Sequence, residues 1–296
     1  MLNNYVFPAE IASRLRKNVK GALFTDLATR GRYATDASIY QQFPLAVLIP
    51  QDAEDVKTAL AVAAEFAIPV LPRGGGTSQC GQTTGAALVI DNSHSFRNIL
   101  EIDLNRAEAE VEPGVVLDHL NAKLKASGLW FPVDVSTGAQ ATIGGMAGNN
   151  SCGSRSIAYG NMVHNVLGIE AWLANGKVGQ FGPYAQSSGV AKELGAFVKG
   201  LAEQLQPDIE ANWPKVLRRV AGYNLDIFHP QSELPYTSDS SVNLAHLLVG
   251  SEGTLAYFKS LRLKLAPLPQ HKVLGVVNFK SFYLSLIHIS EPTRPY

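Results

Sequence analysis

Three loops rich in glycine, serine and threonine contain the residues of this sequence best suited to hold a ligand. The first runs Pro72-Arg73-Gly74-Gly75-Gly76-Thr77-Ser78. Glycines let the backbone approach a ligand closely, and successive backbone N–H groups in such a loop form a nest for anions. Thr77 and Ser78 add hydroxyl donors, while Arg73 adds charge or holds the loop. A pyrophosphate would suit this loop, although three glycines alone more often form a flexible surface turn.

Two better known phosphate-binding motifs do not fit. The first loop is not a Gly-x-Gly-x-x-Gly that opens a helix after the first strand. The sequence also contains no Gly-x-x-x-x-Gly-Lys-Ser/Thr. Neither a Rossmann dinucleotide site nor a P-loop is therefore supported.

The second loop, residues 142–153, is dense in small residues, and the third is Gly250-Ser251-Glu252-Gly253-Thr254-Leu255. Small residues let the start of a helix lie against a flat ligand, with free N–H groups pointing at it. Asn149 and Ser151 could hydrogen-bond a ring edge or a phosphate. Taken in isolation, tight helix packing explains the second loop equally well, and Glu252 is more often a solvated loop carboxylate.

Apolar runs place the first loop between predicted strands. Strands are predicted at 45–50, 68–72 and 87–90, and Asp52 can cap a helix that follows the first of them. This order of strand, helix, strand, glycine loop and strand indicates an α/β unit. Further along the chain, the pattern predicts strands at 99–103, 107–112, 166–173, 246–249 and 255–265, a helix after Pro113-Gly114 that ends at Gly128, and a helix at 190–205.

The composition of the chain argues against some classes of function. The chain has 296 residues, with 25 Lys and Arg against 25 Asp and Glu, so its neutral formal charge gives no support to nucleic-acid binding. Its two cysteines, Cys80 and Cys152, do not form a Cys-x-x-Cys and offer no zinc or iron–sulfur site. No secretion signal or membrane-spanning run is present. We expect a cytoplasmic location, either free or peripheral at the inner membrane.

Taken together, the three loops resemble the FAD-binding domain of the family that includes vanillyl-alcohol oxidase and para-cresol methylhydroxylase. The matching segments are Arg-Gly-Gly-Gly-Thr-Ser at 73–78, Ala-Thr-Ile-Gly-Gly-Met at 141–146, Asn-Asn-Ser-Cys-Gly at 149–153 and Gly-Ser-Glu-Gly-Thr-Leu at 250–255. Within the family, the sequence is most similar to the D-lactate, glycolate and D-2-hydroxyglutarate dehydrogenases. Residues 153–161 and 218–226 also resemble YdiJ-like proteins, which carry a fused iron–sulfur domain.

The resemblance implies an α+β fold of the FAD-binding PCMH type, in which two subdomains of mixed sheet and helix hold FAD between them. We expect an N-terminal extension at 1–43, the FAD-binding domain at 44–267 with subdomains of about 44–100 and 101–267, and the start of a substrate domain at 268–283. Residues 284–296 look like the translation of a sequencing adapter, so we expect a non-native tail and a chain truncated near Tyr283.

The resemblance also assigns the residues that bind the cofactor. The first loop would hold the pyrophosphate, the 132–137 and 142–153 segments would line the pyrophosphate, ribityl chain and ring, and the third loop would lie near the adenosine half or support the flavin pocket. Some relatives bond FAD covalently to a histidine in the first loop, where this chain has Thr77 and Ser78, so we expect non-covalent FAD. The predicted cofactor-binding residues are Arg73, Gly74, Gly75, Gly76, Thr77, Ser78, Pro132, Ser136, Thr137, Thr142, Gly144, Gly145, Asn149, Ser151, Cys152, Gly153, Glu252 and Gly253.

A second segment is a candidate for substrate binding. A guanidinium is a good bidentate partner for a carboxylate, and Arg218 and Arg219 precede a Gly-Tyr-Asn-Leu stretch. In the family that stretch runs along the flavin, so Arg218, Arg219, Tyr223 and Asn224 are predicted to lie near the substrate. Ordinary surface charge explains either arginine about equally well.

The implied reaction is FAD-dependent oxidation of a small D-2-hydroxy acid to the 2-oxo acid, with an electron acceptor that the sequence does not indicate. In relatives, the catalytic histidine and a divalent metal lie in the C-terminal substrate domain, and iron–sulfur cysteines follow later still. We therefore expect these groups beyond this chain, which makes an FAD-binding fragment without turnover one alternative. The other is a flavoenzyme like the NADPH-using UDP-N-acetylmuramate enolpyruvate reductase.

Overall fold

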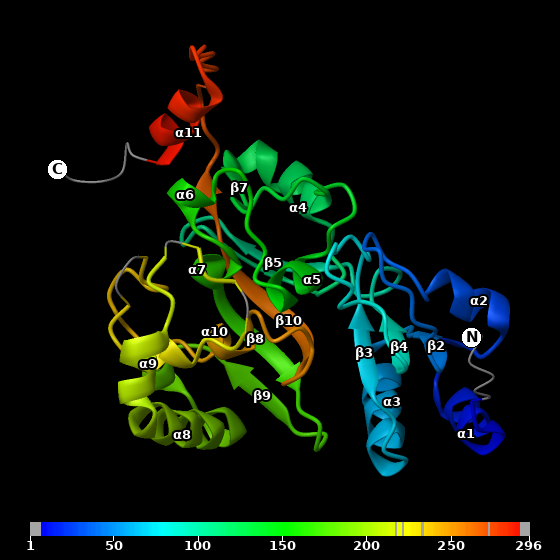
Figure 1. The fold of residues 1–296 in the computed structure, drawn as a ribbon. Helices are drawn as coiled ribbons and strands as arrows, with labels where there is room; N and C mark the ends of the chain where they lie inside the picture. Colours follow the sequence, from blue (N-terminus) through cyan, green and yellow to red (C-terminus); the bar gives the residue numbers. More distant parts are fainter. Residues whose placement is uncertain (1–6, 217, 221, 232–233, 272, 291–296) are drawn as a thin grey trace.

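The computed structural model describes residues 7–216, 218–220, 222–231, 234–271 and 273–290. They form an α+β fold of two lobes, each built on its own sheet and its own hydrophobic core (Figure 1). The chain passes from the first sheet to the second between Asp91 and Ile99. The predicted fold class is thus confirmed.

The first lobe contains the predicted α/β unit. Its parallel strands are β2 (Ala46–Ile49), β4 (Leu88–Asp91) and β3 (Val70–Arg73), paired in that order. Helix α3 (Ala53–Glu65) joins β2 to β3, and the Asp52 side chain accepts hydrogen bonds from the first turn, as the sequence predicts. Because β3 ends at Arg73, the glycine loop leaves the carboxyl end of a parallel strand.

The N-terminal residues are part of this lobe and not a separate extension. Helix α1 (Ala9–Asn18), strand β1 (Ala22–Phe24) and helix α2 (Leu27–Arg32) precede β2, and β1 pairs with β2 antiparallel. Ile11 and Leu15 of α1 are buried in the same core as β2 and α3. The sheet therefore has four strands, and a boundary at residue 43 divides it.

The second lobe is built on a five-stranded antiparallel sheet. Its strand order is β5-β6-β10-β8-β9, so β10, late in the sequence, lies at the centre between β6 and β8. The strands are β5 (Ile99–Asp103), β6 (Glu108–Val111), β8 (Val166–Trp172), β9 (Val178–Phe181) and β10 (Tyr257–Lys264).

Helices and a short two-stranded sheet complete the second lobe (Figure 1). The helix predicted at 190–205 is α8 (Gly189–Gln204), and the one after Pro113-Gly114 is α4 (Leu117–Leu124), which continues as a 3₁₀ turn to a left-handed Gly128. The other elements are β7 (Leu129–Trp130), α5 (Ile143–Gly148), α6 (Ser156–Tyr159), α7 (Met162–Asn165), α9 (Gln206–Asn212), a 3₁₀ turn at Leu225–Phe228, α10 (Ala245–Leu248) and β11 (Ala266–Pro267).

The strand predicted at 246–249 is wrong. The structure has a short helix there, α10, whose first N–H (Ala245) bonds to the side chain of Asn243. A four-residue run with three apolar residues suits a buried strand and a buried helical turn equally, so the pattern alone could not decide. Here Leu244, Ala245 and Leu248 are all buried in the core of the second lobe.

The second sheet contributes two residues to the core of the first lobe. Trp172 and Tyr257, which pair at one end of β8 and β10, are buried in the core of the first lobe. The Tyr257 hydroxyl also donates to the side chain of Asn92, just after β4. The ends of the second sheet therefore anchor it to the first.

Beyond β11 the chain leaves the body and ends in helix α11 (Phe282–Ser290), which projects from the second lobe (Figure 1). Val273, Leu274 and Phe282 are 96%, 88% and 80% exposed, so this segment buries little apolar surface. Residues 291–296 of the expected tail lie outside the described part of the chain. No helix in the described ranges is long and apolar enough to span a membrane.

Candidate functional site

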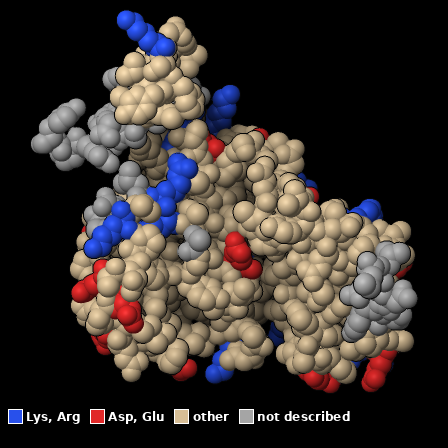
Figure 2. Space-filling model, viewed as in Figure 1, with Lys and Arg blue, Asp and Glu red and all other residues tan. Residues whose placement is uncertain are grey.

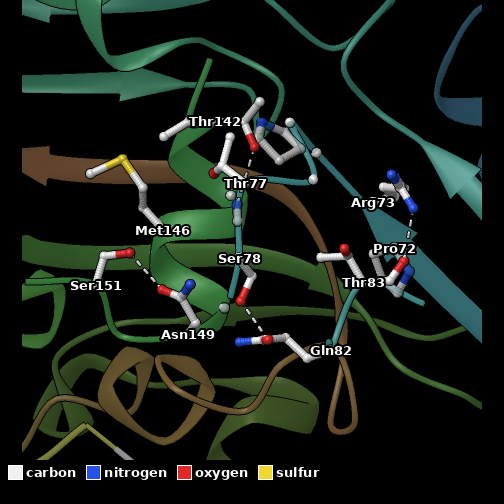
Figure 3. A pocket seen from close by; sticks show the side chains of 18 of the residues that line it. Pro72, Arg73, Thr77, Ser78, Gln82, Thr83, Thr142, Met146, Asn149 and Ser151 are labelled. Carbon is white, nitrogen blue, oxygen red and sulfur yellow. Dashed lines mark hydrogen bonds between the residues drawn. The ribbon is translucent and has the colours of Figure 1, made fainter. Parts of the chain in front are cut away.

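The three glycine loops meet in a cleft between the two lobes. The space-filling view shows a furrow between the lobes, and Figure 3 shows side chains of the first and second loops in the wall of the cleft. The cleft has a volume of about 280 Å³, near the lower end of the ~300–1,000 Å³ typical of small-molecule sites. All the predicted cofactor-binding residues except Pro132 and Gly153 line it: Arg73, Gly74, Gly75, Gly76, Thr77, Ser78, Ser136, Thr137, Thr142, Gly144, Gly145, Asn149, Ser151, Cys152, Glu252 and Gly253.

The first loop presents unpaired backbone donors. Within the described part of the chain, the successive N–H groups of residues 74–78 donate no hydrogen bond. A buried or ligand-facing N–H without a partner is costly, so such a row is suited to an acceptor from outside the protein. The loop also turns through a left-handed Gly76, which has φ of 62°. Its geometry fits an anion with several oxygens.

The Arg73 side chain faces away from the hydroxyls of this loop (Figure 3). Its guanidinium donates to the carbonyl oxygens of Tyr33, Thr35 and Thr83 at 3.1, 2.8 and 3.1 Å. It also lies over the Tyr33 ring, 5.1 Å from the centroid. Burial lowers the pKa of the guanidinium from its ordinary value, although Asp91 opposes this effect. Of the two roles open to Arg73 in the sequence, these contacts match the holding of the loop.

The first loop lies directly on the segment that leads into α5. A Cβ on Gly75 would be 2.3 Å from the carbonyl oxygen of Gln140, and one on Gly74 would be 2.0 Å from Thr142 Oγ1. A Cβ on Gly144 would likewise be 2.4 Å from Pro113. Gly74 and Gly75 therefore allow a close approach of the two lobes, and Gly144 allows close packing within the second lobe.

The second loop does not present the free N–H groups that the sequence suggested. At the start of α5, the N–H groups of Ile143 and Gly144 donate to the carbonyls of Val115 and Pro113, and that of Gly145 donates to Thr142 Oγ1. The chain itself thus satisfies these donors. The polar side chains on this wall include Ser151, whose hydroxyl donates to Asn149 Oδ1 at 2.5 Å.

The third loop makes hydrogen bonds both to the second loop and to Gln82, which follows the first loop. The N–H groups of Gly250 and Glu252 donate to the carbonyls of Ala147 and Gly148 at the end of α5, both at 2.9 Å. Across the cleft, Gln82 Nε2 donates to Glu252 Oε1 at 3.1 Å. Glu252 has φ of 52°, a conformation that is uncommon for a residue other than glycine. A carboxylate that looked merely solvated in the sequence therefore bridges the lobes.

The two predicted residues outside the cleft lie just behind its wall. Pro132 is buried in the loop after β7. Gly153 donates its N–H to Ser156 Oγ at 2.9 Å, and a Cβ there would be 2.1 Å from Asp134 Oδ1. Their positions indicate a supporting role, in which they shape the wall without facing the cleft.

None of the four predicted substrate residues lines this cleft. Arg219 forms an ion pair with Asp226 at 3.1 Å, with both side chains largely buried. Asn224 is buried, and its amide donates to the carbonyls of His246 and Val249. Both side chains thus make structural contacts within the protein. Arg218 and Tyr223 are exposed, and the Tyr223 hydroxyl bonds to Thr254 Oγ1 at 2.8 Å.

The segment nevertheless borders the cleft. The Arg219 carbonyl accepts from Asn150 Nδ2, beside the cleft residues Asn149 and Ser151. A Cβ on Gly250 would be 3.2 Å from the carbonyl oxygen of Gly222. Arg219 and Gly222 therefore lie next to this end of the cleft.

Beneath this segment lies a buried polar cluster. Tyr236 donates to Asn224 and Asp226, and the rings of His164 and His246 pack edge-on against it. Burial raises the pKa of Asp226, although the Arg219 guanidinium opposes this effect. Burial lowers the pKa of His246 to about 4 and also lowers that of His164. Both imidazoles are therefore neutral at neutral pH.

Some residues of the cleft wall have no signal in the sequence. Gln82 and Thr83 follow the first loop in an irregular segment, and Asn92 follows β4 at the position where parallel strands end. Asn92 could have been identified from its position at the end of a predicted strand. Gln82 could be placed in the cleft only once the fold was known. The apolar part of the wall also includes three residues that the sequence analysis did not single out as cleft residues: Pro113, Ala256 and Phe258.

This wall fits a flavin dinucleotide. A pyrophosphate could accept from the N–H row of the first loop, and the glycine contacts leave no Cβ between that loop and the second. The apolar side chains Met146, Val135 and Phe258 provide a surface for a flat ring. Within the described ranges, no group of three or more His, Cys, Asp or Glu residues is placed to hold a metal ion.

Comparison with known proteins leads to the same cofactor. Residues 44–182 match the model of the FAD binding domain family. D-2-hydroxyglutarate dehydrogenase of Pseudomonas putida is 33% identical over 287 residues, which are 93% of this chain and 28% of that protein. The corresponding Escherichia coli protein is 33% identical over 88% of this chain and 26% of its own length. The glycolate oxidase subunit GlcD of Bacillus subtilis is 32% identical over 86% and 44%.

Solved structures of other proteins share the fold. An alkyldihydroxyacetonephosphate synthase superimposes with a TM-score of 0.63 over 92% of this chain and 42% of its own, at 17% identity. The Physcomitrella patens protein BBE-like 1 does so with a TM-score of 0.59 over 86% and 44%, also at 17% identity. At this identity the likeness concerns the fold alone. The chain spans about a quarter of the length of the D-2-hydroxyglutarate dehydrogenases it matches. Residues 44–182, just under half of the chain, thus match the FAD binding domain family, and most of the chain is similar in sequence to D-2-hydroxyglutarate dehydrogenases, a glycolate oxidase subunit and a D-lactate dehydrogenase.

Proposed function

We propose that this chain is the flavin-binding part of an FAD-linked dehydrogenase that oxidises a D-2-hydroxy acid to the 2-oxo acid. The observation that carries the proposal is the cleft wall: among the described residues, the N–H groups of 74–78 donate no hydrogen bond, and their loop packs closely on Gln140 and Thr142. The chain is also related to dehydrogenases of such acids. The names of its relatives point to D-2-hydroxyglutarate, D-lactate or glycolate as the substrate class.

The chain's own residues would bind and orient the cofactor. The first loop would hold the pyrophosphate through neutral N–H dipoles, and the side chains of Asn149 and Ser151 would meet polar edges of the ligand. No histidine or covalent attachment point lies in the first loop, so we propose that the flavin is non-covalent. When bound, FAD supplies the acceptor for the hydride that leaves the carbinol carbon of the substrate.

The cleft offers little for the proton that must leave the substrate hydroxyl. Among the described residues of its wall, the ionisable side chains are Arg73, Cys152 and Glu252, and Arg73 and Glu252 are hydrogen-bonded within the protein. General acid–base catalysis needs a group within reach of that proton. This observation favours a second candidate function, an FAD-binding unit that does not turn over substrate on its own.

One experiment separates these functions. The purified chain is incubated with FAD, desalted, and its flavin absorbance is followed under anaerobic conditions on addition of D-2-hydroxyglutarate, D-lactate or glycolate. Bleaching by one of these acids, and not by its L-enantiomer where one exists, supports the dehydrogenase. Bound flavin without bleaching supports the binding unit, bleaching by NADPH indicates an enolpyruvate reductase, and a protein that retains no flavin contradicts the whole proposal.

A further inference from the structure

Arg73 occupies the inside of the turn made by the first loop. A Cβ on Gly76 would be 2.8 Å from Arg73 Nη2, so the loop curls closely over the guanidinium. The planar group donates to carbonyls on two other segments: Tyr33 and Thr35 before β2, and Thr83 after the loop. Three such bonds use the fixed fork geometry of the side chain.

The N-terminal segment that begins at Tyr33 also makes a backbone hydrogen bond to the first loop. The N–H of Ala37 donates to the carbonyl of Gly76 at 3.1 Å, four residues after the segment begins at Tyr33. The Tyr33 hydroxyl in turn donates to Asp91 Oδ2 at 2.6 Å, which ties the segment to the end of β4. The ends of the turn are therefore held by one segment, which is itself held by the sheet.

This arrangement separates two roles that an arginine in a phosphate-binding loop can play. A guanidinium that binds the ligand needs donors free to reach it, whereas the donors seen here are directed to protein carbonyls. The cofactor-facing donors are the N–H groups of residues 74–78, whose directions depend on the shape of the turn.

We infer that Arg73 is a positioning residue for the cofactor: by joining the 33–35 segment to Thr83 beneath the loop, it fixes the N–H row that receives the pyrophosphate. The planar, forked shape of the guanidinium accounts for this role, and its positive charge does not. The inference rests on the proposed FAD site. It also makes the segment before β2 part of the cofactor site, although no residue of that segment lines the described cleft.

The test compares Arg73→Lys with Arg73→Met, and uses Arg106→Met as a control for the loss of an arginine from an exposed ion pair. A lysine keeps the charge but cannot reproduce the planar fork. We expect both Arg73 variants to bind FAD roughly 10- to 100-fold more weakly than the wild type, and to a similar extent, in fluorescence titrations. The control is expected to bind like the wild type.

A spectroscopic measurement distinguishes positioning from general loss of stability. At saturating FAD, the ³¹P resonances of the bound pyrophosphate are expected to move toward those of free FAD in both Arg73 variants. Tyr33→Leu removes the ring beneath the guanidinium without touching the cleft, so the same change, smaller in size, is expected there even if an Arg73 variant does not fold.

The outcomes are distinct. Wild-type affinity in Arg73→Lys together with a loss in Arg73→Met would show that charge is what matters, and would overturn the inference. Unchanged ³¹P resonances in the saturated variants, with only a lower melting temperature, would reduce Arg73 to a structural residue and also overturn it. Failure of the wild-type chain to bind FAD would instead refute the proposed function.

Discussion

Gly75 offers the sharpest test of how the cleft is built. A Cβ placed on it would be 2.3 Å from the carbonyl oxygen of Gln140 and 3.1 Å from the carbonyl carbon, both backbone atoms that cannot rotate away. Ordinary contact begins near 3.4 Å, so Gly75→Ala must separate the first loop from the second by about 1 Å. We expect overpacking of this kind to lower the free energy of unfolding by about 1–3 kcal/mol.

The same substitution is expected to weaken cofactor binding by a similar free energy. A displacement of about 1 Å takes an N–H···O bond out of range, and the loss of one bond to a charged phosphate oxygen weakens binding by roughly 10- to 100-fold. Fluorescence titration with FAD measures this affinity, and thermal unfolding of the ligand-free protein measures stability.

Gly85→Ala is the matched control. A Cβ there meets only Leu71 Cδ2 at 3.4 Å, and Gly85 does not line the cleft. We expect its stability to stay within about 0.5 kcal/mol of the wild type, with unchanged FAD affinity. Wild-type binding by Gly75→Ala would refute the close contact between the loops, and equal losses in both variants would show that the measured effect is unspecific.

Two further predictions concern the buried polar cluster. The folded-state pKa of His246 is about 4 and its ordinary value is 6.5, so below pH 6.5 the unfolded chain binds a proton that the folded one does not. Stability should fall as the pH drops from 6.5 toward 4, by up to about 3 kcal/mol, and urea titrations of His246→Gln should show a flatter pH dependence than the exposed control His271→Gln. Arg219→Met leaves the Asp226 carboxylate buried without its charged partner and should lower the free energy of unfolding by about 3–5 kcal/mol. Arg106→Met, at an exposed pair, should leave stability nearly unchanged, and equal losses in denaturant unfolding would contradict this reading.

The local parts of the fold could be predicted because short-range chemistry determines them. Asp52 caps α3 as expected, and the glycine loop follows β3 directly. The order of strands in the second sheet could not be predicted, since β10 reaches its central place only through pairings with β6 and β8 that are distant in sequence. The 246–249 run was too short for its period to separate strand from helix.

The candidate site divides in the same way. Glycine spacing located the three loops, because only glycine allows the close backbone contacts now seen at Gly74 and Gly75. The hydrogen-bond partners of the polar groups could not be predicted from the sequence. No feature of the neighbouring sequence indicated that the N–H groups of α5 would donate to the carbonyls of Val115 and Pro113. Nor did any indicate that the Asn224 amide would donate to the carbonyl of His246 in α10.

The burial of Trp172 and Tyr257 in the core of the first lobe has a consequence for synthesis of the chain. The lobe's strands and helices are all complete by Asp91, yet its core lacks two large aromatic side chains until residue 257 has emerged from the ribosome. Domains generally fold as units while they are being made. Here the N-terminal lobe must wait for more than 160 residues of later sequence. The 44–182 segment matched by the family model contains Trp172 but ends before Tyr257, so its core would remain incomplete if that segment were made alone.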